Sequence, residues 1–89
     1  MEALFPLGQC VITANATDVL HPEDIRSAMD RHKSGDWGDL GPEDWKENEL
    51  AITSGLRLFS RYHDRCGKKF YIITEHDRSV TTVLLPEDY

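Results

Sequence analysis

The stretch that decides the fold is residues 56–85, LRLFSRYHDRCGKKFYIITEHDRSVTTVLL. From 56 to 63 apolar and polar side chains alternate with a period of two, which is typical of a β-strand. Residues 64–68 contain a glycine and predict a tight turn, and 69–75 form an apolar and aromatic strand. After a second polar reversal, 80–85 is a last strand. The stretch therefore predicts a three-stranded antiparallel meander.

Two helices are predicted before this meander. Residues 21–24, His-Pro-Glu-Asp, and 41–44, Gly-Pro-Glu-Asp, are helix-start signatures. In both, proline takes the first helical position and two acids face the positive end of the helix dipole. We expect the first helix to end near Gly35 and the second at Gly55, because glycine accepts the left-handed conformation that ends many helices.

The beginning of the chain completes the predicted order of elements. Residues 7–13 are a short apolar run with β-branched side chains and predict a strand, and 15–20 predict a single helical turn. A strand, two to three helices and three consecutive strands indicate the α+β class, with the helices packed on one face of the sheet. Residues 1–89 are enough for one core and too few for two, so we expect a single domain.

Charge is abundant and unevenly distributed. Ten basic and sixteen acidic residues give a net charge of −6. This charge repels phosphate backbones, so we expect no direct nucleic-acid binding, and a basic partner surface is the natural complement. Residues 36–49 hold six acids and one base, whereas 57–69 hold five bases and one acid. Both segments are explained by solvated surfaces, and a binding surface is the alternative.

Cysteine usage and hydropathy indicate the compartment. Cys10 and Cys66 are far apart and form no CxxC motif, so they predict neither a zinc site nor a disulfide framework. Residues 1–8 lack a basic leader and are interrupted by proline, so we expect no signal peptide. No segment approaches the roughly 20 apolar residues that cross a bilayer. We therefore expect a cytoplasmic protein with reduced thiols and no membrane contact.

His32 has two interpretations. It lies on the apolar face of the first predicted helix, which favours a buried histidine that is hydrogen-bonded through its ring nitrogens. Alternatively, His32, Asp36, Glu75 and Asp77 have the residue types of a hydrolytic metal site, although their spacing matches no metal-binding signature. Because no motif for a metal or organic cofactor is complete, we expect none.

The loop GDWGDLG, residues 35–41, spaces its glycines by three but matches no phosphate-binding pattern, and its two aspartates would repel phosphate. We expect Trp37 to fold inward while the glycines permit a reversal between the helices. In the second polar reversal, Glu75, Asp77 and Arg78 either satisfy backbone groups or form a recognition rim.

Two tyrosines suggest a further possibility for the predicted hairpin. Tyr62 and Tyr71 interleave with basic residues, as aromatic side chains do on surfaces that stack single-stranded nucleic acid. Aromatic residues in strands are usually packing residues, and the net charge opposes such binding. The packing interpretation is therefore preferred from the sequence.

Three segments resemble a family of small proteins found on plasmids and integrative elements: 32–39 (HKSGDWGD), 47–49 (ENE) and 73–89 (ITEHDRSVTTVLLPEDY). Members of that family are often labelled plasmid-related proteins, or type I restriction endonuclease subunit M, although this chain has no cofactor-binding glycine motif. The resemblance implies a genomic setting and no catalytic residues. Small acidic proteins of mobile elements are frequently inhibitors of host defence, including anti-CRISPR and anti-restriction proteins.

The sequence thus predicts a non-enzymatic inhibitor that binds a basic nucleic-acid-binding surface of a CRISPR or restriction complex. Its acidic segment 36–49 would make the contact, with one of two tryptophans as an anchor. A metal-dependent hydrolase and an antitoxin-like partner of a neighbouring gene product are the alternatives. The candidate binding residues are Asp36, Trp37, Asp39, Glu43, Asp44, Trp45, Glu47, Glu49, Glu75, Asp77 and Arg78.

Overall fold

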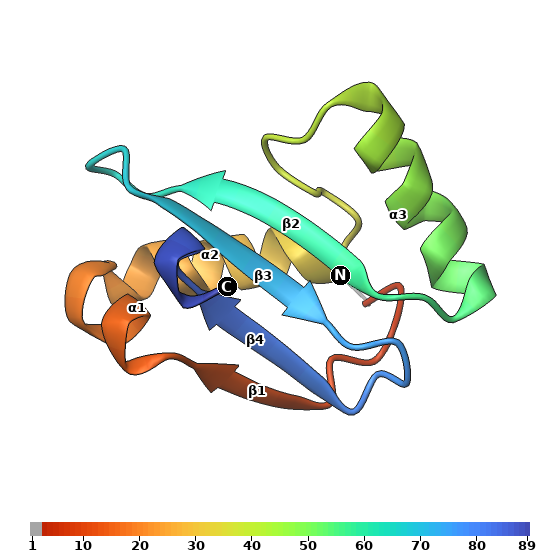
Figure 1. Cartoon of the computed structure of the whole chain (residues 1–89), viewed down its shortest axis with the longest axis horizontal. Helices are drawn as coiled ribbons and strands as arrows, with labels where there is room; N and C mark the ends of the chain where they lie inside the picture. Colours follow the sequence, from red (N-terminus) through yellow and green to blue (C-terminus); the bar gives the residue numbers. More distant parts are fainter. Residues whose placement is uncertain (1–2) are drawn as a thin grey trace.

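The computed structural model describes residues 3–89 and consists of a four-stranded sheet and three α-helices (Figure 1). The α+β class and the antiparallel pairing of the last three strands are confirmed. The elements are β1 (Gln9–Ile12), α1 (Ala14–Val19), α2 (Pro22–Lys33), α3 (Pro42–Ser54), β2 (Leu58–His63), β3 (Lys69–Thr74), β4 (Val80–Leu84) and a 3₁₀ turn η1 (Pro86–Asp88).

The sheet is mixed, which differs from the predicted three-stranded meander. Its strand order is β1-β4-β3-β2, and β1 pairs with β4 in parallel, with Gln9 opposite Val80 and Ile12 opposite Val83. A parallel partner requires a long connection, and here that connection contains all three α-helices and the β2–β3 hairpin. The first strand therefore joins the meander as its fourth member.

The helix starts follow the local signals in the sequence. Pro22 and Pro42 occupy the first positions of α2 and α3, as predicted. The ring of His21 accepts a hydrogen bond from the Glu23 N–H at 3.2 Å and so caps α2. At the other end of α3, Gly55 has a φ of 69° and ends the helix in the left-handed conformation.

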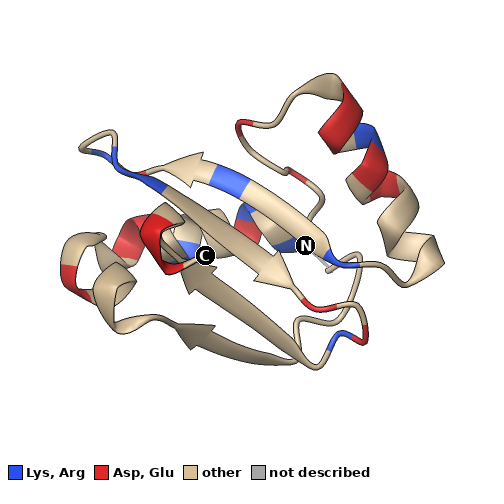
Figure 2. Ribbon diagram, viewed as in Figure 1, with Lys and Arg blue, Asp and Glu red and all other residues tan. Residues whose placement is uncertain are grey.

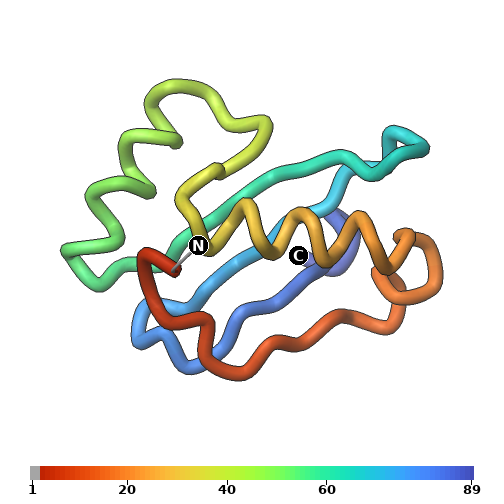
Figure 3. Tube along the Cα trace, turned by 180° about the vertical axis from the view of Figure 1, so that it is seen from behind, coloured from red at the N-terminus to blue at the C-terminus, as the bar shows by residue number. Residues whose placement is uncertain are grey.

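The core lies mainly between one face of the sheet and the helices α1 and α2. Seen from behind, α2 runs across the sheet (Figure 3). The side chains of β2 and β3 that point toward α2 are buried, because alternate residues of a strand face opposite sides. The main cluster consists of Ala16, Leu20, Ile25, Ala28, Tyr62, Phe70, Ile72, Val83 and Leu85.

A second, smaller cluster attaches α3 to the edge of the sheet. Trp37 is completely buried between Phe5, Ala51 and Leu58. Its ring stacks on Phe5 with centroids 6.0 Å apart and meets the ring of His32 edge-on at 5.5 Å. The inward orientation predicted for Trp37 is therefore confirmed. This tryptophan is a core residue and presents no surface to a partner.

The β2 edge of the sheet is covered by polar contacts. Asn48 of α3 donates a hydrogen bond to the Phe59 carbonyl at 2.6 Å and accepts one from the Phe59 N–H at 3.2 Å. The loop before α3 pairs with Arg61, which donates its N–H to the Trp37 carbonyl and accepts one from the Asp39 N–H. These contacts satisfy backbone groups that would otherwise be open to pairing with another chain.

Two further findings bear on the predictions. Within residues 3–89, no helix is long and apolar enough to cross a membrane. Both cysteines, Cys10 and Cys66, are exposed and free.

Candidate functional site

A groove separates α3 from the neighbouring strand β2. Its volume is about 660 Å³. Helix α3 supplies Asp44, Glu47 and Leu50 to one wall, and Phe59 and Tyr89 belong to the lining on the sheet side. The remaining lining residues are Leu40, Asn48, Ala51, Leu56 and Arg57. The groove therefore combines an apolar lining with carboxylates from one side.

The apolar part of this groove is unusually exposed. Leu50, Leu56 and Tyr89 are 61%, 59% and 69% exposed, respectively. All three line the same groove. Single exposed apolar side chains are common on soluble proteins, but a contiguous group beside a groove is typical of an interaction surface.

The acidic side chains of α3 are free for external contacts. Glu43, Asp44, Glu47 and Glu49 are all exposed, and none forms an ion pair within the described part of the chain. Figure 2 shows these acids gathered on one helix, with a single basic residue among them. Trp45 is half-buried and packs against the second cluster, so it holds the helix in place.

The predicted loop residues have mainly structural roles. Asp36 accepts two hydrogen bonds from the Arg31 guanidinium, at 2.8 and 3.2 Å, and these bonds hold the pKa of Asp36 below its usual range. Its carboxylate also accepts the Gly38 N–H at 3.1 Å and so shapes the loop. Asp39 is exposed, 3.8 Å from His63. With Trp37 buried and Asp36 held by Arg31, Asp39 is the exposed acid of this loop beside those of α3.

The polar reversal between β3 and β4 supports the end of α3. Arg78 donates hydrogen bonds to the carbonyls of Ala51 at 2.8 Å and Leu56 at 2.6 Å, and so satisfies the end of the helix. Asp77 accepts hydrogen bonds from the backbone and hydroxyl of Ser79, which lower the pKa of Asp77. Glu75 pairs with Arg57 at 3.4 Å. These contacts favour the interpretation in which Arg78 satisfies backbone groups over the one in which it forms a recognition rim.

His32 is a buried structural residue. Its Nδ1 lies 2.5 Å from the Ser60 hydroxyl and its Nε2 lies 2.9 Å from the Thr74 hydroxyl. Thr74 in turn shares a hydrogen bond of 2.7 Å with Thr81, which donates to the Leu7 carbonyl. Burial lowers the pKa of His32 to about 3, because the charged form loses its water. Through these hydrogen bonds the His32 ring links α2 to β2, β3 and β4, and it has no exposed surface.

The residues of the alternative metal site do not come together. The side chain of His32 is engaged by two hydroxyls and that of Asp36 by a guanidinium. Glu75 and Asp77 are occupied in the other reversal. Within residues 3–89, no group of three or more histidine, cysteine, aspartate or glutamate side chains is placed to hold a metal ion. In the described residues these four side chains therefore do not form one site.

Several residues of the groove were not predicted from the sequence. Leu50, Leu56, Phe59 and Tyr89 line it alongside the predicted acids. One signal was present for Leu50, because it falls outside the apolar face that Trp45 shares with the other inward residues of its helix. Its position outside that face leaves Leu50 exposed, so its side chain does not contribute to the core.

Comparison with known proteins adds no family to this description. The chain matches no protein-family model, no curated protein and no solved structure.

Proposed function

We propose that this protein acts without catalysis, by binding another protein in the groove between α3 and β2. The observation that carries this proposal is the coincidence, in one groove, of three exposed apolar side chains with carboxylates that form no ion pair within residues 3–89. Apolar contacts supply most of the affinity at such surfaces, and charges select the partner and speed association. Asp44 and Glu47 favour a partner that presents basic residues beside an apolar side chain.

The resemblance to proteins of mobile elements supports a particular class of partner. Nucleases and RNA-guided complexes bind their substrates through basic surfaces, which the acids of α3 complement. We therefore propose that the partner is a CRISPR or restriction complex, and that occupation of its nucleic-acid surface inhibits it. Such an inhibitor works where the partner works, which favours the cytoplasm.

The test measures inhibition by the purified protein. Purified restriction enzymes and CRISPR effector complexes would be assayed for DNA cleavage and for direct binding of the protein. Two variants address the groove: Glu47→Lys reverses a charge, and Leu50→Asp introduces a charge at its apolar side. Each is expected to weaken binding tenfold or more, which corresponds to about 1.4 kcal/mol or more.

Matched controls come from α1, which is remote from the groove. Asp18→Lys changes the charge by the same amount as Glu47→Lys, and Val19→Asp replaces an apolar side chain that is 51% exposed. Both control variants are expected to bind and inhibit as the unmodified protein does. The proposal is rejected if no complex in the panel is bound or inhibited, or if the controls weaken binding as strongly as the groove variants.

A further inference from the structure

The sheet has a second face that no α-helix covers in the described part of the chain. Helix α2 lies behind the sheet, and only η1 reaches over the front (Figures 1 and 3). Because side chains alternate along a strand, this face is formed by the residues of β2 and β3 that point away from α2. They are Phe59, Arg61 and His63 of β2, and Lys69 and Tyr71 of β3; Ile73 lies on the same face but is only 3% exposed.

Three aromatic rings cluster on this uncovered face. The rings of Phe59 and Tyr71 come from adjacent strands, and their centroids are 4.8 Å apart. Tyr89 approaches both rings edge-on, at 6.3 Å from Phe59 and 6.1 Å from Tyr71. Phe59 and Tyr71 are half-buried, whereas Tyr89 is 69% exposed. The rings therefore form a platform that is accessible from solvent, and the buried core does not enclose them.

Tyr62, which the sequence associated with the same possibility, does not belong to the platform. It is 2% exposed and packs against Phe70 on the opposite face of the sheet. Of the two tyrosines, only Tyr71 lies among the basic residues of the uncovered face.

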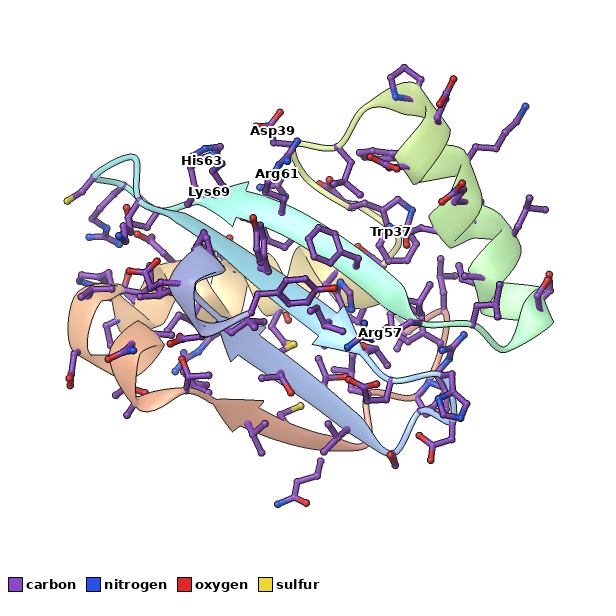
Figure 4. All side chains as sticks on the ribbon, in the orientation of Figure 1. Trp37, Asp39, Arg57, Arg61, His63 and Lys69 are labelled. Atoms are coloured by element: carbon purple, nitrogen blue, oxygen red, sulfur yellow. The ribbon has the colours of Figure 1, made fainter. Side chains whose placement is uncertain are left out.

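Basic residues surround these rings. Figure 4 shows Arg61, His63 and Lys69 toward the hairpin end of β2 and β3, and Arg57 at the opposite end of β2. Within residues 3–89, neither Arg61 nor Lys69 forms an ion pair with a carboxylate. Arg61 uses its Nε to hold the Asp39 carbonyl at 2.8 Å, which leaves its terminal nitrogens unused. Arg61 and Lys69 thus place two positive charges on this face that no carboxylate within residues 3–89 pairs with, in a chain whose net charge is −6.

From this arrangement we infer that the uncovered face binds a short segment of single-stranded nucleic acid. Bases have flat faces that stack on aromatic rings, and their phosphates pair with arginine and lysine. From Arg57 to His63 the strand rises about 20 Å, at about 3.3 Å per residue. That length accommodates about three nucleotides, in line with other sheets that stack two or three bases. The carboxylates of α3 bound the face on the β2 side and oppose a longer contact there.

This site goes beyond the proposed function, and the two can be tested separately. The two surfaces adjoin, because Phe59 and Tyr89 belong to both. Their distinguishing residues are separate: Glu47 and Leu50 belong to the groove, and Tyr71 and Lys69 belong to the platform. Groove variants that lose the protein partner are therefore expected to keep nucleic-acid binding. Platform variants that lose nucleic-acid binding are expected to keep the protein partner.

The experiment uses fluorescence anisotropy with the full chain and short labelled homopyrimidine strands, oligothymidylate and oligouridylate. Saturable binding is expected at low ionic strength. Tyr71→Leu keeps an apolar side chain but removes the ring, and it is expected to weaken binding by about 5- to 100-fold. Lys69→Gln is expected to reduce the slope of log affinity against log salt by about 0.7, the value for one phosphate contact on a single strand.

The controls separate a built site from general attraction to polyanions. Arg26 is exposed on α2, away from this face, and Arg26→Gln changes the net charge by the same amount as Lys69→Gln. It is expected to leave affinity and salt slope unchanged. A strand of abasic sugar-phosphates and a DNA duplex serve as competitors, and both are expected to compete poorly. Circular dichroism of each variant confirms folding.

Four outcomes would overturn the inference. They are the absence of saturable binding at low ionic strength, an equal loss in Arg26→Gln, unchanged affinity in Tyr71→Leu, and competition by the abasic strand as strong as that of the base-bearing one. The last outcome would show that the face attracts any polyanion, including an acidic protein segment, without reading bases.

Discussion

Acidification from pH 7 to pH 5 is expected to destabilise this protein through His32. The ring is enclosed between α2 and the sheet, with a hydroxyl at each nitrogen. Burial lowers the pKa of His32 to about 3, whereas an ordinary histidine titrates near 6.5. Between these two pH values the ring therefore stays neutral in the folded protein, whereas the same histidine takes up a proton in the unfolded chain.

The sign and size of the effect follow from this difference. Above pH 6.5 neither state binds the proton, so the contribution of the neutral ring to stability is complete. Between pH 6.5 and 3 only the unfolded state binds it, and the free energy of unfolding falls by about 1.4 kcal/mol per pH unit. From pH 7 to pH 5 the loss is roughly 2 kcal/mol. Asp24 acts at lower pH, because hydrogen bonds from Arg65 lower its pKa to about 2.

The assay is urea unfolding at pH 7, 6 and 5, followed by tryptophan fluorescence. Trp37 is a suitable probe because its ring lies 5.5 Å from the His32 ring. A His76→Gln variant, altered in an exposed turn, should retain the pH dependence, and a folded His32→Gln variant should lose most of it. Nuclear magnetic resonance of the histidine rings tests the same point without a mutation. Constant stability from pH 7 to 5, or titration of His32 near pH 6.5, would refute the reasoning.

Further predictions concern the attachment of α3. Asn48→Ala removes both hydrogen bonds to Phe59 and leaves the Phe59 backbone unsatisfied. The free energy of unfolding should therefore fall by about 2 to 3 kcal/mol, and groove binding should weaken. A loss below about 0.5 kcal/mol in urea unfolding would contradict this prediction. Gly38 has a φ of 77°, and a Cβ there would overlap the Arg61 carbonyl oxygen, so Gly38→Ala should cost roughly 3 kcal/mol or more. Gly55→Ala is the matched control, because its φ of 69° is similar but nothing lies within 4 Å of the added carbon. It should cost only about 1 kcal/mol, and equal melting temperatures for the two variants would show that steric overlap at Gly38 is unimportant.

The local features of the fold could be predicted from the sequence. The starts of α2 and α3 are encoded by Pro22 and Pro42 with the acids that follow them, and the hairpin by alternating side chains. The parallel pairing of β1 with β4 could not be predicted, because Gln9 and Val80 are brought together only by the packing of everything between them. Strand periodicity indicates which residues share a face, but it does not indicate which face the helices cover.

The candidate site was predicted only in part for a related reason. The acidic character of 36–49 is visible in the sequence, but whether a given acid is free depends on its neighbours in space. The Asp36 carboxylate forms an ion pair with Arg31, whereas Glu47 has no basic partner in the described part of the chain. The aromatic cluster of Phe59, Tyr71 and Tyr89 could not be predicted either, because the position of Tyr89 over the sheet depends on the fold of the whole chain.

The pairing of β1 with β4 also has a consequence for the folding of the protein during its synthesis on the ribosome. The segment near Gln9 leaves the exit tunnel long before its partner near Val80 has been made, with about 70 residues synthesised in between. Until then the early strand has no neighbour, and closing so long a loop is entropically costly. The meander is therefore expected to form first as a self-contained unit, and the early segment to dock last, which makes it the part of the nascent chain most exposed to chaperones and proteases.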